Sequence, residues 1–328
     1  MAAADGKIVI RCRAADVSRS QKRTRETRNT ENPDRRALKG NRMKKTNQLP
    51  TAFLAGLLLA LPPLSAPALA EEDLAVTEIV ETVDLDQPAA TDGWSFPVAL
   101  EDMNPEYIVL ANKHYLLSED YVPRDLVKVP KDPKKGGIKW KSAPKEGHQL
   151  RKDCAEALCA MNAAMREIDG FQEMYLKSAY RSYRTQKTMY RNRLAKHNGK
   201  DDGWVSQPGA SDHQTGLGCD VIPYNWTKKS GMNEKMMQEE ECQWMAAHCH
   251  EYGFIIRYPA EKKDWTEINT EPWHLRYVGI PVATYIAENG LCLEEFHQQL
   301  QAAIDGYLAA GGDRSRVEAF IQVSSDEN

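Results

Sequence analysis

Residues 211–220 read SDHQTGLGCD and lead directly into an apolar run. This run predicts a strand that begins near Asp220. On a regular strand, His213 and Asp220 would point to opposite faces of a sheet because they lie seven residues apart. Gly216 and Gly218 lie between them and allow the backbone to turn back, since glycine adopts conformations that other residues avoid. Both side chains can therefore face one site.

A second histidine, His274, lies in the run EPWH at residues 271–274. A catalytic zinc ion is bound by three histidine or carboxylate side chains and keeps a fourth position open. His213, Asp220 and His274 supply such a set. The alternative is that they are ordinary polar residues of a strand-rich core, and spacing alone leaves both interpretations open.

The run EPWH also places a carboxylate close to His274. Pro272 suits the second position of a β-turn, with Glu271 at the first position and His274 at the fourth, their Cα atoms within ~7 Å. We therefore expect a β-turn here and the free Glu271 carboxylate beside the metal.

The surrounding pattern predicts short strands with helices between them. Ser182 is a suitable N-cap for a basic helix that ends near Lys196. We expect an α+β fold, a single domain with a small antiparallel sheet flanked by helices. Strands are expected at 107–110, 173–180, 220–222, 254–258 and 273–278, further helices at 150–168, 239–252 and 281–310, and a surface loop at 128–147.

Three ordered segments closely resemble the VanY-type D-alanyl-D-alanine carboxypeptidases, which are zinc peptidases of bacterial peptidoglycan. They are SAYRS at 178–182, the Ser-x-His-x-x-Gly-x-x-x-Asp pattern at 211–220, and EPWH at 271–274. The resemblance covers roughly residues 104–290 and implies the fold of the LAS metallopeptidases and the hedgehog signalling domain. One departure is Gly218, where the family usually has alanine.

The resemblance implies a role for each matching residue. His213, Asp220 and His274 would bind one catalytic zinc ion. Glu271 would act as general base, taking a proton from the attacking water and passing it to the departing D-alanine. The expected activity is removal of the C-terminal D-alanine from peptidoglycan stem peptides.

A carboxypeptidase must also recognise a free carboxylate, for which the planar guanidinium of arginine is well suited. Arg181 matches the family's arginine and would either hold that carboxylate or stabilise the oxyanion. The resemblance also places Gln186 and Ser211 near the substrate.

Other activities remain open at this level. An L,D-carboxypeptidase acting on tetrapeptides, or an endopeptidase cleaving crosslinks, would use the same residues. A non-catalytic wall-binding module would keep the fold and the zinc, but it has no need for a carboxylate beside the metal. Glu271 therefore favours an enzyme.

The segment from Met43 has the three parts of a secretory signal, with a basic pair, an apolar run at 52–61 and a small-residue site ending at Ala70. The run is shorter than the ~20 residues of a membrane-spanning helix, although an uncleaved anchor is the alternative. We expect cleavage after Ala70, an extracytoplasmic bacterial protein, and a start at Met43, with 1–42 an over-extended reading frame. The expected organisation is a doubtful leader at 1–42, a signal peptide at 43–70, an acidic disordered linker at 71–103, a peptidase domain at 104–310 and a tail at 311–328.

Charge is unevenly distributed along the chain. The first 70 residues hold 14 of the 43 Lys and Arg and five of the 47 Asp and Glu, which leaves 29 and 42, a net charge of −13, for residues 71–328. This acidic part has no basic surplus to bind phosphates, and we exclude nucleic acid as a partner. We expect a monomer.

Seven cysteines comprise Cys12 in the leader and six in the expected domain. Disulfides and free buried thiols are both consistent with the pattern, and the sequence does not resolve a pairing. Helical spacing argues against bridges within the first pair of the six and within the fourth and fifth. The six are Cys154, Cys159, Cys219, Cys242, Cys249 and Cys292.

Overall fold

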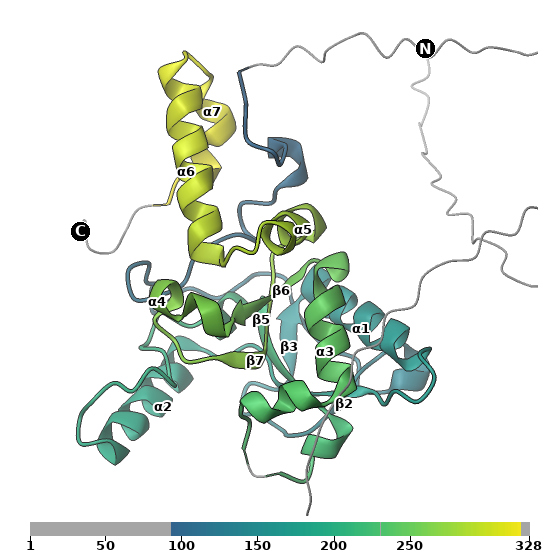
Figure 1. Cartoon of the computed structure of the whole chain (residues 1–328). Helices are drawn as coiled ribbons and strands as arrows, with labels where there is room; N and C mark the ends of the chain where they lie inside the picture. Colours follow the sequence, from purple (N-terminus) through teal and green to yellow (C-terminus); the bar gives the residue numbers. More distant parts are fainter. Residues whose placement is uncertain (1–92, 230, 323–328) are drawn as a thin grey trace, which may run out of the picture. The chain divides into compact units, whose positions relative to one another are not determined.

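The computed structural model describes residues 93–229 and 231–322, which all fall in the unit Val80–Asn328 (Figure 1). The expected leader and signal peptide, Cys12 and the acidic segment up to residue 92 lie outside the described residues. Among the residues that are described, no helix is both long and apolar enough to span a membrane.

The described residues form seven strands and seven α-helices, together with short 3-10 helices. The strands are β1 (Leu126–Lys128), β2 (Lys139–Trp140), β3 (Gln149–Arg151), β4 (Met174–Ser178), β5 (Gly218–Pro223), β6 (Phe254–Tyr258) and β7 (Glu271–Tyr277). The helices are α1 (Lys152–Arg166), α2 (Tyr183–Lys196), α3 (Glu240–His248), α4 (Lys263–Thr266), α5 (Ile280–Glu288), α6 (Leu293–Ala309) and α7 (Arg314–Val317).

Several local expectations are confirmed. The Ser182 side chain caps α2 by accepting a hydrogen bond from the amide of Thr185 at 3.3 Å, and α2 ends at Lys196. The expected helix at 239–252 is α3 followed by the 3-10 helix η6 (Cys249–Tyr252), and Gly253 ends it in the left-handed conformation. These signals are local, because each depends on residues within one turn of the helix.

The main sheet has five strands in the order β2-β4-β5-β7-β6. β4, β5, β7 and β6 pair antiparallel, whereas β2 joins β4 in parallel. The expected α+β fold is therefore confirmed, with a parallel edge strand inside the segment that we expected to be a surface loop. β1 and β3 form a separate antiparallel pair.

One face of the main sheet packs against the apolar sides of α1 and α3 (Figure 1). Cys219 on β5 and Leu275 on β7 contribute to this core. Because side chains alternate along a strand, the neighbouring residues Asp220 and His274 point to the opposite face. Asp220 and His274 thus stand on a sheet whose other face is packed.

Two irregularities in strand pairing lie next to these ligands. On β4, Leu176 pairs with Val221 and Ser178 pairs with Asp220, so that Lys177 is an extra residue in a β-bulge. On the other side, Ile256 pairs with Leu275 and Tyr258 with Glu271, so that one residue of β6 faces three of β7. Bulges of this kind change the direction of side chains beside functional sites.

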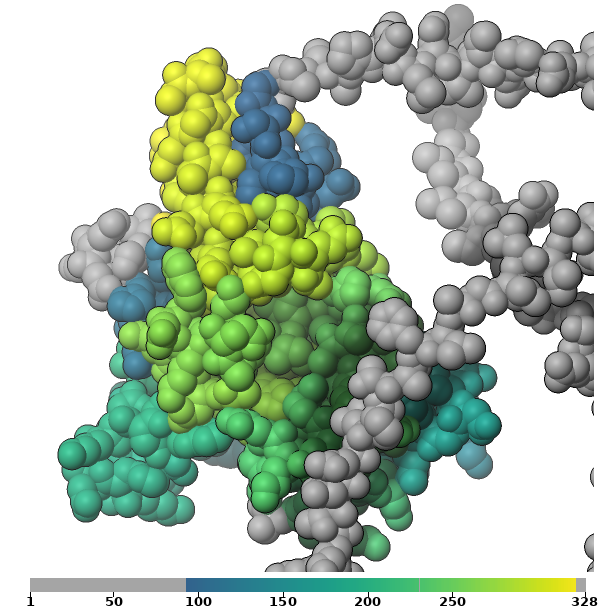
Figure 2. Space-filling model, in the orientation of Figure 1, coloured from purple at the N-terminus to yellow at the C-terminus, as the bar shows by residue number. Residues whose placement is uncertain are grey.

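A second buried cluster joins the first described residues to the C-terminal helices (Figures 1 and 2). The expected linker to 103 and tail from 311 are therefore wrong at their inner ends, because apolar residues in both segments are buried. The apolar residues of both segments pack against α5 and α6, and these two helices contribute further buried residues to the same cluster. The buried residues in question are Phe96, Val98, Leu100, Met103, Val317 and Phe320.

The expected strand at 107–110 is also wrong. Arg276 Nη2 donates hydrogen bonds to the carbonyl oxygens of Tyr107 at 3.0 Å and Val109 at 2.6 Å. These carbonyls are thus satisfied by a buried guanidinium instead of a neighbouring strand. All six cysteines of the described residues are buried free thiols.

Candidate metal centre and substrate pocket

His213 lies in the 3-10 helix η3 (Asp212–Thr215), which is followed by Gly216. Gly216 has φ +68°, the left-handed conformation that glycine favours, and it ends η3 before β5 begins. The expected return of the chain at this glycine is confirmed. His213 Nδ1 donates to the carbonyl oxygen of Ala179 at 2.7 Å, because a carbonyl can only accept. Its Nε2 is thereby left to face Asp220.

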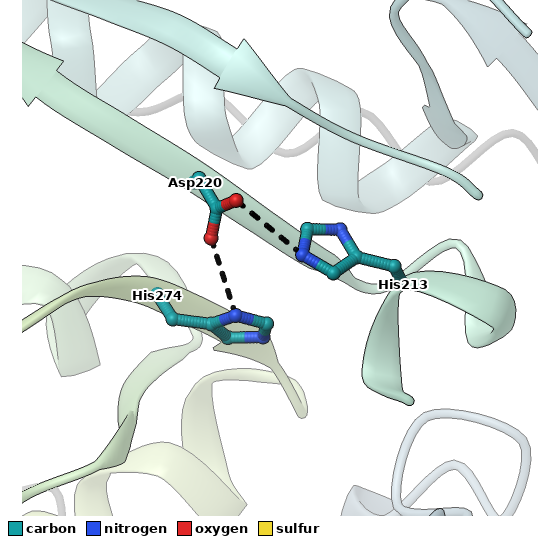
Figure 3. Close-up of side chains that lie close together, drawn as sticks. All are labelled: His213, Asp220 and His274. Atoms are coloured by element: carbon teal, nitrogen blue, oxygen red, sulfur yellow. Dashed lines mark ion pairs between the residues drawn. The ribbon is translucent and has the colours of Figure 1, made fainter. Parts of the chain in front are cut away.

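Asp220 and His274 lie opposite each other in the register of β5 and β7. Asp220 Oδ1 is 3.2 Å from His274 Nδ1, and Asp220 Oδ2 is 3.5 Å from His213 Nε2. Figure 3 shows the three side chains pointing toward one another. One candidate ligand atom from each residue lies within 4.8 Å of the other two, and all three side chains are buried.

Burial and neighbouring charges shift the pKa values of these three groups. Burial alone would raise the pKa of Asp220, but the imidazoles of His213 and His274 lower it well below its usual range. Burial, with the nearby Arg181 guanidinium, lowers the pKa of His213 to about 4. Burial would also lower the pKa of His274, but the adjacent Asp220 and Glu271 carboxylates raise it to about 9. At neutral pH and without a metal, the site therefore holds an ionised Asp220, a neutral His213 and a protonated His274, whose proton a bound cation would displace.

Glu271 begins β7, and its Oε2 lies 3.5 Å from His274 Nδ1. The expected β-turn at Pro272 is wrong, because residues 271–277 form a strand. The irregular pairing with β6 achieves the same result, since the extra residues of β7 let Glu271 and His274 approach each other. Burial raises the pKa of Glu271, which suits a group that must accept a proton near neutral pH.

Arg181 follows β4, and its backbone amide donates to the carbonyl oxygen of His213 at 3.1 Å. Burial lowers the pKa of its guanidinium, although the Asp220 and Glu271 carboxylates oppose this. Among the described residues, Nε of Arg181 is buried without a hydrogen-bond partner, and Nη1 meets only the sulfur of Met189 at 3.2 Å. A partly buried guanidinium with unmet donors is suited to bind a carboxylate from outside the chain.

Gln186 and Ser211 lie beside the other candidate site residues. Both are buried, and both line a pocket of about 310 Å³ with the three candidate ligands, Glu271 and Arg181. Gln186 Nε2 donates to the carbonyl oxygen of Ser206 at 2.5 Å, while its Oε1 has no partner among the described residues. The structure thus brings together all seven predicted site residues.

Three further residues of this pocket were missed by sequence reasoning. Tyr258 is buried and its ring lies 5.0 Å from that of His274. Trp204 stacks parallel to the buried Trp273 at 6.4 Å and forms part of the wall. Lys177 stands at the β4 bulge. A bulge and a long-range ring stack leave no periodic signal in the sequence, so only the segment containing Tyr258 could have been found from the resemblance.

A second cluster of buried charges lies behind the candidate ligands. Arg257 Nε donates to Asp212 Oδ2 at 2.7 Å, and its two terminal nitrogens donate to Glu294 at 2.6 and 2.8 Å. Arg276 Nη1 donates to the other oxygen of Asp212. Asp212 Oδ2 in turn lies 4.0 Å from His274 Nε2. We call Asp212, Arg257, Arg276 and Glu294 the paired cluster.

Comparison with known proteins agrees with this geometry. The family VanY, described as D-alanyl-D-alanine carboxypeptidase, matches residues 147–280. "Putative carboxypeptidase YodJ" of Bacillus subtilis (strain 168) is 37% identical over 203 residues, which are 60% of this chain and 70% of that protein. The D-alanyl-D-alanine carboxypeptidase of Enterococcus faecalis (strain ATCC 700802 / V583) is 35% identical over 129 residues, which are 36% of this chain and 45% of that protein.

Among solved structures, the LdcB LD-carboxypeptidase is similar at 36% identity with a TM-score of 0.52. The likeness covers 60% of this chain and 87% of that one. The matched region of the family contains the three candidate ligands, Glu271 and Arg181. On these grounds the chain belongs to the family of VanY-type D-alanyl-D-alanine carboxypeptidases.

Proposed function

We propose that this protein is an exported zinc-dependent carboxypeptidase that removes the C-terminal D-alanine from peptidoglycan stem peptides. The observation that carries the proposal is the buried group His213, Asp220 and His274, which shares one pocket with Glu271 and Arg181. A metal-binding group, a buried carboxylate beside it and an unpaired guanidinium are the three components that hydrolysis of a C-terminal residue requires.

The candidate ligands fit zinc. A tetrahedral ion with nitrogen and oxygen ligands at ~2.0–2.2 Å separates its ligand atoms by about 3.3–3.6 Å. Asp220 Oδ2 lies 3.5 Å from His213 Nε2, and Asp220 Oδ1 lies 3.2 Å from His274 Nδ1. Both distances are close to that separation. Asp220 Oδ1 is also buried without a hydrogen-bond partner among the described residues, as expected of an atom that binds a cation.

The residues of the chain would divide the reaction between them. Bound zinc would supply a Lewis acid that polarises the scissile carbonyl and acidifies water. Glu271 would take a proton from the attacking water and pass it to the departing amino group of D-alanine. Arg181 would hold the terminal carboxylate of the substrate, which fixes the scissile bond beside Glu271.

Hydrolysis is tested with the full chain and the variant Glu271→Gln. The variant should keep one zinc ion per chain, measured by elemental analysis, and lose at least about a hundredfold of hydrolysis, because the amide cannot accept the proton. Glu261→Gln, an exposed glutamate away from the pocket, is the matched control and should keep full activity. Undiminished turnover by Glu271→Gln would contradict the mechanism.

An L,D-carboxypeptidase is the second candidate, because the similar solved LdcB structure is that of an LD-carboxypeptidase. Mass spectrometry of muropeptides distinguishes the two. A D,D-carboxypeptidase shortens pentapeptide stems to tetrapeptides, whereas an L,D-carboxypeptidase shortens tetrapeptides to tripeptides. Cleavage of crosslinked dimers into monomers would indicate an endopeptidase. Zinc binding without any of these reactions would indicate a wall-binding module.

Export is part of the proposal and rests on the signal-like segment at 43–70. Expression in a bacterial host should yield a secreted or envelope-bound protein whose N-terminus, by peptide sequencing, is Glu71. An uncleaved protein in the membrane fraction would favour the anchor, and a cytoplasmic one would contradict export.

A further inference from the structure

We infer that Lys177 is a specificity residue whose ammonium binds a second carboxylate of the substrate, located on the N-terminal side of the scissile bond. This inference rests on the proposed function, because it assigns a recognition group within the same pocket. Arg181 would bind the terminal carboxylate, so that Lys177 would bind a different part of the peptide.

The position of Lys177 on β4 is the first observation that supports this role. On a regular strand Lys177 and Ser178 would point to opposite faces of the sheet. The pairing of Leu176 with Val221 and of Ser178 with Asp220 makes Lys177 the extra residue, and both Lys177 and Ser178 line the pocket. Leu176 is buried in the core on the other face of the sheet, so alternation points Lys177 to the side that holds Asp220, and the bulge keeps Ser178 on that side as well.

The second observation is that this lysine has no carboxylate partner among the described residues. Its backbone carbonyl accepts a hydrogen bond from Ser142 Oγ at 2.6 Å, which holds the bulge. Lys177 is half-buried, and its ammonium forms no ion pair with any described carboxylate. Lys139 on the neighbouring strand β2, in contrast, pairs with Glu173. Lys177 is therefore available to an anion that enters the pocket.

The order of groups along the chain determines which anion this is. Ser178 lies opposite Asp220, and the amide of Arg181 bonds to the carbonyl of His213. Along the chain, Lys177 thus precedes the residue that lies opposite Asp220, and Arg181 follows it beside His213. If Arg181 holds the terminal carboxylate, Lys177 faces the other side of the scissile bond. Lys177 and Arg181 are four positions apart, so their Cα atoms lie at most ~13 Å from each other at 3.3 Å per residue, a span comparable to a few residues of an extended peptide.

The test uses acetylated tripeptides that end in D-Ala-D-Ala and carry either Glu or Gln before it. The wild-type chain should hydrolyse the Glu peptide with a kcat/KM about three- to tenfold higher, since a partly buried ion pair contributes modestly. Lys177→Met should reduce this ratio to about one, and Lys177→Glu should favour a peptide with Lys at that position. Lys187→Met, on the exposed side of α2, should keep the wild-type ratio.

Peptide binding separates this inference from the proposed function. Zinc-loaded Glu271→Gln should bind the Glu peptide more tightly than the Gln peptide in calorimetry, and adding Lys177→Met should remove the difference. Moving Glu one residue further from D-Ala-D-Ala identifies which position carries the carboxylate. Equal binding of the Glu and Gln peptides at both positions, or no change on Lys177→Met, would overturn the role of Lys177. If the wild-type chain hydrolyses the Glu and Gln peptides equally well, the proposed function stands and the role of Lys177 is contradicted. If it binds the Glu peptide more tightly but hydrolyses neither peptide, the role of Lys177 stands and the proposed function is contradicted.

Discussion

The paired cluster and the candidate metal site are two adjacent groups of buried charged residues, and they differ in how their polar atoms are satisfied. In the paired cluster, Asp212 and Glu294 each accept charged hydrogen bonds from Arg257. In the candidate metal site, Asp220 Oδ1 has no hydrogen-bond partner among the described residues. Buried polar groups are normally satisfied within the chain. The contrast indicates that the paired cluster stabilises the fold, whereas the metal site is organised to bind something else.

Breaking the paired cluster should have the largest effect. Arg257→Met leaves Asp212 and Glu294 with less compensation in a buried environment, which should lower the free energy of unfolding by about 3–5 kcal/mol. Denaturant titration followed by circular dichroism measures this. Arg193→Met removes a partly exposed pair with Asp202 and should cost less than about 1 kcal/mol. Equal losses from the two variants would remove the distinction between structural and exposed pairs.

Breaking the metal site should affect binding more than folding. His213→Ala should weaken zinc binding more than about a hundredfold, because even outer partners of metal ligands affect affinity by about 10–100-fold. Its zinc-free form should lose less stability than Arg257→Met does. Competition with a chromogenic chelator measures the affinity, and His250→Ala, away from the site, is the control. A His213→Ala protein with full zinc affinity would exclude His213 as a ligand.

The contact between the two groups can be perturbed at Gly218. A Cβ added there would lie 2.9 Å from both the backbone carbonyl carbon and the Cβ of Asp212. Gly218→Ala should therefore cost about 1–3 kcal/mol of stability, although the family usually has alanine at this position. It should also weaken zinc binding, because His213 follows Asp212 directly. Gly231→Ala, whose Cβ would meet no atom within 4 Å, is the control in both assays.

A smaller effect is expected from pH. Burial would raise the pKa of Glu294, but its pairing with Arg257 lowers it below the ordinary value of 4.5. The pKa of Asp212 is lowered in the same way by Arg276 and Arg257. A depressed carboxyl pKa contributes stability that is fully present above the unfolded value and is lost as the pH falls through the folded one. The melting temperature should thus decline below about pH 4.5, and less steeply in Arg257→Met. A parallel decline in both proteins would contradict this assignment.

Much of the site could be predicted from the sequence. His213, Asp220, His274 and Glu271 were identified by residue type and spacing together with the family resemblance, and Arg181 by its segment. The backbone conformation that brings Glu271 close to His274 was not predicted. A proline after Glu271 suits a turn, but pairing with β6 extends this segment into a strand, and strand pairing is not visible in local sequence.

The domain edges were predicted less well for a similar reason. An acidic, turn-rich composition indicated a linker up to 103, yet Phe96, Val98 and Leu100 are buried against the C-terminal helices. A few apolar residues in a polar segment acquire a partner only when the chain brings a distant apolar surface beside them. That surface is formed by α5 and α6, about 200 residues further along the chain.

The sequence by itself determined the chemistry and the local elements of this protein. Ligand types, the glycine that ends η3, the Ser182 cap and the helical period of α1 are encoded within short segments, because they depend on single residues or one helical turn. The tertiary structure alone decided the β4 bulge beside Lys177, the irregular pairing that joins Glu271 to His274, and the paired cluster. Each of these depends on which distant segments become neighbours, and that is set by burial and pairing over the whole fold.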